Sequence, residues 1–240
     1  ASLSLIGPEA TPVSVAAYLS VITKVAAFFA FVRVLGELPP ATGWPLVIAL
    51  IAAATMTYGY LAALVQTNLV RLIAYSSVAQ SGYFLLGIAA LGVSPLAVPS
   101  VIMFGAAYVA MNLGAFAIVM VAGRNLDDMR GFGRRAPFSG VAMVIFLLSL
   151  TGIPPLFGFV GKVYLFGAAI EAGFLWLAVI GILNTVLALG VYLRIIVPMY
   201  RTADNDSAAV PPGSPLLTIV WAVAALVTLF MGLLAGLLPG

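Results

Sequence analysis

The chain has 240 residues, of which 64% are hydrophobic and 7% are charged, and its formal net charge is +3. Soluble domains carry about 25% charged residues, so this composition excludes a soluble globular protein and indicates an integral membrane protein. Transmembrane β-barrels alternate apolar and polar residues in short strands, whereas this chain has long unbroken apolar runs. The predicted fold class is therefore all-α, a polytopic bundle of transmembrane helices.

The charge pattern and the missing residue types exclude several functions. The basic residues gather in loops and at helix ends, where membrane topology explains them, so the positive charge does not predict nucleic-acid binding. The sequence has no cysteine and no histidine, which removes cysteine-ligated iron–sulfur clusters and histidine-ligated haem. We therefore expect no cofactor on this chain and no metal site.

Seven apolar segments are long enough to cross a membrane, since about 20 apolar residues span the hydrocarbon as a helix. Short turns rich in proline and glycine separate most of them, and two longer polar loops cover 123–137 and 201–215. We assign residues 1–240 to a single membrane domain. Its predicted helices cover 12–35, 44–66, 69–91, 95–122, 137–169, 174–200 and 215–238.

The arginines predict the orientation of the chain. Seven of them fall on one side of the predicted bundle, and Arg33 alone falls on the other. By the positive-inside rule the N-terminal side is then cytoplasmic and the C-terminus lies outside. The sequence does not begin with methionine, and an odd number of helices departs from the paired repeats of many transporters, so we expect further helices before residue 1.

Lys24 lies about a dozen residues into the first predicted helix, close to the middle of the membrane. A lysine at this depth costs about 2.5–3.5 kcal/mol on insertion scales, and such residues often line ion or proton paths. Ser20, one helical turn earlier, shares its face. The structural alternative is a lysine that snorkels to the interface or pairs with an acid on a partner helix.

The fifth segment, 137–169, is too long for one straight crossing and carries a second lysine, Lys162, near its middle. Glycine and proline residues just before that lysine predict a broken helix, namely Gly152, Pro154, Pro155 and Gly158. Transporters use broken helices at ion sites, so we interpret Lys162 as a proton-relay residue. The alternative is that Lys162 caps carbonyls freed at the break, and the two roles are compatible.

Polar side chains on neighbouring segments extend the lysines into a candidate polar axis. On the third predicted helix, the 4-then-3 spacing of Ser76, Gln80 and Tyr83 places them on one face. On the fourth helix, Tyr108 and Asn112 are one turn apart. In a membrane such residues also serve as hydrogen-bonding groups between helices, and that alternative stays open.

Three segments resemble the antiporter-like membrane subunits of respiratory complex I, and among these the N type. They read TPVSVAAYLSVITKVAAFFAFVRVL, RLIAYSSVAQSGY and FLLSLTGIPPLFGFVGKVYLFGAA. The resemblance implies that Lys24 belongs to a central hydrophilic axis and that Lys162 is the terminal lysine on a broken helix. Bacterial N-type subunits commonly carry histidine at the position of Gln80, so we expect no histidine-dependent relay here.

The resemblance implies the C-terminal half of a proton-translocating subunit of a bacterial NADH:quinone oxidoreductase in the inner membrane. NAD, FMN, iron–sulfur clusters and quinone would then reside on other subunits. The expected partners are the lipid bilayer and other complex I membrane subunits, including a neighbouring antiporter-like subunit. Two alternatives remain at this stage: a subunit of a multisubunit cation/proton antiporter, and a structural membrane subunit whose lysines only pair with partner acids.

Overall fold

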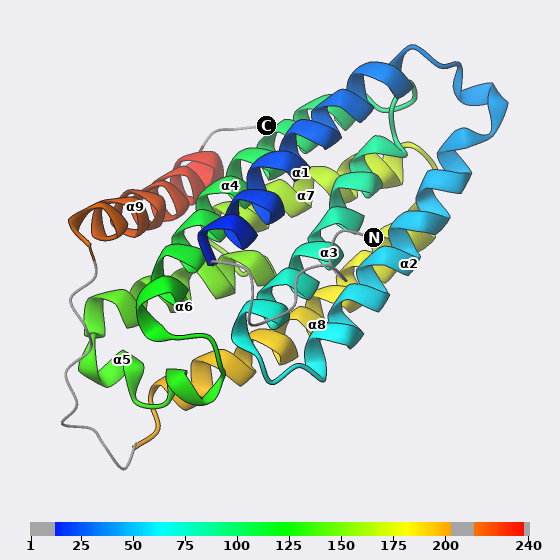
Figure 1. Ribbon diagram of the computed structural model, residues 1–240. Coiled ribbons are helices and arrows are strands. Elements are labelled where there is room, and N and C mark those ends of the chain that lie inside the picture. The colour runs from blue at the N-terminus through cyan, green and yellow to red at the C-terminus, as the bar shows by residue number, and fades with distance from the viewer. Residues whose placement is uncertain (1–12, 203–213, 238–240) are drawn as a thin grey trace.

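The computed structural model describes residues 13–202 and 214–237, and every regular element in these ranges is a helix. The long helices run side by side in an elongated bundle (Figure 1). The predicted all-α fold class is confirmed. The predicted helix ends at 12 and 238, and most of the second polar loop, lie outside the described residues. The elements are α1 (Val13–Gly36), η1 (Pro40–Thr42), α2 (Trp44–Leu64), α3 (Leu69–Ile88), α4 (Ala97–Ala122), η2 (Asp127–Met129), α5 (Phe132–Arg135), α6 (Pro137–Thr151), α7 (Phe157–Glu171), α8 (Leu175–Met199) and α9 (Pro215–Leu237).

Five of the described helices are individually long and apolar enough to cross a membrane: α1, α2, α4, α8 and α9. The helix α3 has 20 residues but carries the polar stripe, which lowers its hydropathy. The helices α6 and α7 have 15 residues each, or about 22 Å at 1.5 Å per residue, which is short of the roughly 30 Å hydrocarbon core. The predicted segment 137–169 therefore consists of two half-length helices.

The helix α4 lies at the centre of the bundle and contacts α1, α3, α6, α7 and α9. On one flank α2 packs along α3, and on the other α9 lies against the outside of α4, α6 and α7 (Figure 1). Small residues allow the close α2–α3 approach, because a Cβ on Gly59 would collide with the backbone of Ala79. The polar stripe of α3 is thereby held inside the protein.

The break in the fifth segment runs from Gly152 to Leu156. Gly152 ends α6 with φ of +92°, a left-handed conformation that glycine adopts readily. We had predicted a break extending to Gly158, but α7 begins at Phe157 and Gly158 lies in its first turn. Pro154 and Pro155 are the exposed residues of the break. They have no amide N–H, so no backbone donor is left unsatisfied at these positions.

Candidate functional site

Lys162 lies on α7, five residues after the helix begins, and only 2% of it is exposed. Its Nζ donates a hydrogen bond of 2.8 Å to the Thr151 carbonyl at the end of α6. The same Nζ lies 4.1 Å from the centroid of the Tyr83 ring, within the range of a cation–π contact. The break therefore holds the buried amine between a backbone oxygen and an aromatic face.

The last four carbonyls of α6 all have partners, although a helix leaves these groups without bonds of its own. Leu148 and Ser149 accept hydrogen bonds from backbone amides just beyond the helix. The Leu150 carbonyl accepts one of 3.0 Å from Gln80 Nε2, and the fourth carbonyl is the one bound by Lys162. Two of the predicted site residues thus converge on one helix end. The capping interaction that we considered for Lys162 is present in this geometry.

Gln80 also connects the break to a buried cluster of hydroxyl groups. Its Nε2 donates a second, longer hydrogen bond of 3.4 Å to the Tyr192 hydroxyl. That hydroxyl lies beside the side chains of Ser76 and Tyr60. Within the described ranges, the buried Gln80 Oε1 and the Tyr60 hydroxyl have no hydrogen-bond partner. This hydroxyl cluster extends the site from α3 and α6 to α2 and α8.

The predicted residues on α1 and α4 form a second group, which adjoins the first because the Tyr108 hydroxyl lies beside Ser77 of α3. The Tyr108 hydroxyl donates a hydrogen bond of 2.7 Å to the Ser20 carbonyl, and Asn112 Nδ2 donates one of 3.1 Å to the Tyr108 carbonyl. Lys24, one turn beyond Ser20, is partly buried. Among the residues that the structure describes, none forms a hydrogen bond or ion pair with its amine.

A run of aromatic ring contacts connects the two groups. Phe84 stacks edge-on against Tyr108, with centroids 5.5 Å apart, and against Phe104, with centroids 4.9 Å apart. Phe104 in turn lies 6.0 Å from the ring of Tyr83. The structure therefore brings Gln80, Tyr83 and Lys162 together, and it brings Ser20, Tyr108 and Asn112 together. Phe104 contacts the rings of both tyrosines, Tyr83 and Tyr108.

Several groups of the site could not be predicted from the sequence. The Thr151 and Leu150 oxygens are backbone carbonyls, so the residue types at these positions do not predict their role as hydrogen-bond acceptors. Ser149 resembled a core residue, yet its hydroxyl accepts a hydrogen bond of 3.0 Å from the Gly158 amide in the first turn of α7. Tyr60 lies in an apolar run, and Tyr192 shares a helical face with Asn184 that packing alone would explain. In the described part of the chain, His, Cys, Asp and Glu form no group that could hold a metal ion.

The sequence of this chain is similar to a known family of membrane proteins and to curated members of it. The family described as NADH:quinone oxidoreductase/Mrp antiporter, transmembrane, matches residues 7–188. NADH-quinone oxidoreductase subunit N 1 of Streptomyces griseus is 42% identical over 232 residues, which are 95% of this chain and 49% of that protein. The chain thus spans about half the length of the curated relatives it matches.

Two solved structures share the fold. A chain of respiratory complex I from Thermus thermophilus with bound aureothin superposes with a TM-score of 0.82 at 30% identity, over 95% of this chain and 51% of that one. A chain of the Mrp complex from Dietzia sp. DQ12-45-1b gives a TM-score of 0.75 at 23% identity, over 89% of this chain and 49% of that one. At that identity the second likeness concerns the fold alone.

Proposed function

Because the chain belongs to the family of NADH:quinone oxidoreductase/Mrp antiporter transmembrane proteins, we propose that it translocates protons as part of an N-type subunit of a bacterial NADH:quinone oxidoreductase. The observation that carries the proposal is Lys162, a buried amine held at a helix break on the Thr151 carbonyl. Ionisable residues inside a membrane are costly and characteristic of proton and ion pathways. Electron transfer to quinone takes place on other subunits, with their NAD, FMN and iron–sulfur clusters.

In the proposed step Lys162 takes up a proton at mid-membrane and releases it toward the outer side. The Thr151 carbonyl and the Tyr83 ring are both partners for an ammonium group. Gln80 does not titrate, so it acts by orienting its neighbours. Its buried Oε1 has no protein partner in the described ranges, and such atoms are typical binding points for ordered water.

Lys24 serves in this scheme as the lateral neighbour of Lys162 in the polar axis. Ser20, Tyr108 and Asn112 supply hydrogen-bonding groups on its side. Among the described residues no hydrogen bond joins this group to Lys162, but the Tyr108 hydroxyl lies beside Ser77, the neighbour of Ser76 in the hydroxyl cluster. Proton exchange between the lysines therefore requires water to bridge the Tyr108 hydroxyl, the hydroxyl cluster and Lys162.

The proposed function also implies a membrane, an orientation and partner subunits for the chain. We place it as a multi-pass chain in the bacterial inner membrane, with its N-terminal side cytoplasmic and its C-terminus outside. Its partners are other membrane subunits of the complex, including a neighbouring antiporter-like subunit. The relatives that carry the name of subunit N support this assignment.

The decisive test is Lys162→Ala in the intact enzyme, purified and reconstituted into vesicles. We expect assembly to persist and the number of protons moved per electron to fall. Val163→Ala is the matched control, because Val163 is the next residue on α7 and is 47% exposed. An assembled Lys162→Ala enzyme that pumps as many protons per electron as the parent would overturn the relay.

Two alternatives give different outcomes. A subunit of a cation/proton antiporter, a function included in the family description, would produce a Na⁺-dependent ΔpH in vesicles without NADH. A purely structural subunit would lose assembly when either lysine is replaced, while the complex that remains keeps its full pumping ratio.

A further inference from the structure

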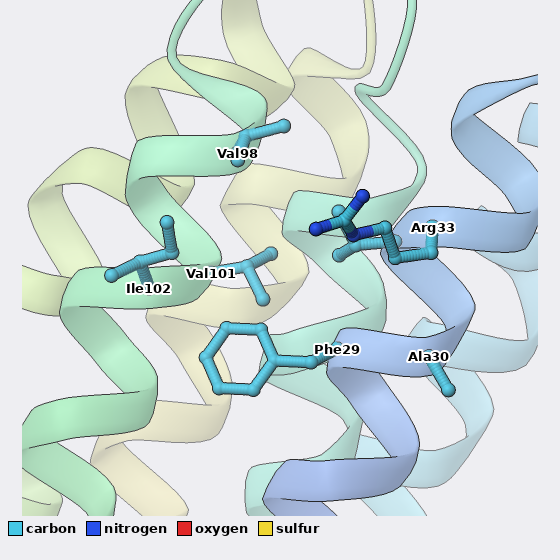
Figure 2. Close-up of a pocket in the computed structure, with 7 residues that line it drawn as sticks. Phe29, Ala30, Arg33, Val98, Val101 and Ile102 are labelled. Carbon is cyan, nitrogen blue, oxygen red and sulfur yellow. The ribbon is translucent and has the colours of Figure 1, made fainter.

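A groove of about 650 Å³ opens on the surface between α1 and α4. Figure 2 shows its lining, which comes from both helices: Phe29, Ala30, Arg33, Val98, Val101 and Ile102. Phe29 is 38% exposed and Ile102 is 51% exposed, so the groove faces the surroundings of the chain. Apart from Arg33, the described residues that line the groove are all apolar.

Among the described residues that line the groove, Arg33 alone is charged. Its side chain reaches from α1 toward the Val98–Val101 turn of α4 (Figure 2). Among the residues that the structure describes, no hydrogen bond or ion pair involves its guanidinium. The groove therefore presents one positive charge with no anionic partner from the surrounding helices.

The depth of Arg33 matches the headgroup level of a bilayer. It lies in the last turn of α1, nine residues after the central Lys24, which is about 14 Å along the helix axis. Half of a hydrocarbon core about 30 Å thick is nearly the same length. Phe29 and Ile102 lie about one turn deeper on their helices than Arg33 and Val98. The groove therefore has a charged group at the interface and apolar side chains deeper in the membrane. A phospholipid has the same order, with its headgroup at the interface and its acyl chains below.

We propose that this groove binds one phospholipid with an anionic headgroup. The guanidinium of Arg33 holds the phosphate, because its planar fork matches phosphate oxygens and can bind two of them. One acyl chain lies along Phe29 and Ile102. A headgroup of net negative charge is favoured over a zwitterionic one because no described residue that lines the groove is acidic, and Glu37, one turn after Arg33, forms no ion pair with it. This inference does not depend on the proton-translocating function.

The test uses two photoactivatable phospholipids that differ only in the headgroup, phosphatidylglycerol and phosphatidylcholine, each with a diazirine on an acyl chain. The chain is reconstituted in its intact membrane assembly, illuminated and digested, and labelling of the peptide that contains Ile102 is measured. We expect the anionic lipid to label it about fivefold more than the zwitterionic lipid, the preference expected for one basic residue at an anionic surface. Arg33→Gln should remove this preference, and Arg33→Lys should keep part of it.

Labelling near Leu183 and Val186 on α8 provides the control, since these side chains are 61% and 66% exposed and belong to an apolar surface. There the two lipids should label equally in every variant. Equal labelling of the groove by both lipids in the unaltered protein would overturn the proposal. So would a failure of both lipids to label the groove while both label α8, the result expected if another polypeptide covers the groove. Both readouts come from the unaltered protein, so they hold even if Arg33→Gln fails to assemble.

Discussion

Lys24 and Lys162 occupy similar depths in apolar runs but very different surroundings in the fold. Lys162 is 2% exposed and bonded to the Thr151 carbonyl, whereas Lys24 is partly buried and has no hydrogen bond from the described residues. The cause is the backbone. A continuous helix such as α1 uses its interior carbonyls for its own hydrogen bonds, while the break after α6 leaves two carbonyls for side chains. A lysine beyond a break finds its partner within its own membrane segment.

The largest loss of stability should come from adding a side chain at Gly158, where α7 packs closely against the end of α6. A Cβ on Gly158 would collide with the Ser149 carbonyl and come within 2.9 Å of Met111 Sδ. Gly158→Ala should therefore push α7 away from α6 and cost about 3 kcal/mol of stability, the upper end for overpacking. We expect a lower thermal midpoint in detergent and less assembled protein in the membrane.

Gly190→Ala is the matched control on α8. Its new Cβ would lie 3.8 Å from a Leu64 methyl group, an ordinary contact, and alanine favours a helix over glycine by up to about 1 kcal/mol. This variant should be as stable as the parent or slightly more stable. If both alanine variants behaved alike, the close α6–α7 contact would not be what organises the Lys162 site.

The architecture around Lys162 was predictable because proline and glycine act locally. Consecutive prolines exclude a continuous helix whatever surrounds them, so the position of the break could be predicted from Pro154 and Pro155. Its length was overestimated, since Gly158 is helical. Glycine marks either flexibility or close packing, and only the fold shows that Gly158 makes room for the Ser149 carbonyl.

The partners of the polar residues could not be predicted, because they depend on which helices meet. Gln80 was a polar residue on a helical stripe, and its bond to the Leu150 carbonyl links residues 70 positions apart. Tyr192 and Tyr60 join the same cluster from α8 and α2. A spacing of three and four residues defines a face, but the neighbour of that face is a property of the whole bundle.

A smaller effect should follow from Gln80→Leu, which leaves the Leu150 carbonyl and the Tyr192 hydroxyl without their shared donor. Leaving a buried acceptor unsatisfied costs about 1–3 kcal/mol, so the thermal midpoint should fall by a measurable but lesser amount than in Gly158→Ala. Proton pumping per electron should fall as well, because the relay loses its ordering group.

Gln66→Leu makes the same chemical change two residues after the end of α2. The Gln66 side chain donates only to the Ala62 carbonyl one turn earlier and is partly exposed, so its loss should cost less than about 0.5 kcal/mol. Equal costs at the two glutamines would mean that the Leu150 carbonyl gains little from Gln80. The break would then rest on Lys162 and the backbone amides alone.

The smallest effect is expected on the side of Lys24, from Tyr108→Phe. The variant removes the hydrogen bond to the Ser20 carbonyl but keeps the ring against Phe84, and a carbonyl inside α1 retains its helical partner. The loss should be near 1 kcal/mol, against almost none for Tyr58→Phe, whose residue is 63% exposed. Thermal midpoints of the two variants measure the difference. If Tyr108→Phe lost as much stability as Gln80→Leu, the helices around Lys24 would be packed as firmly as those around the break. The two lysines would then differ only in the partners of their own amines.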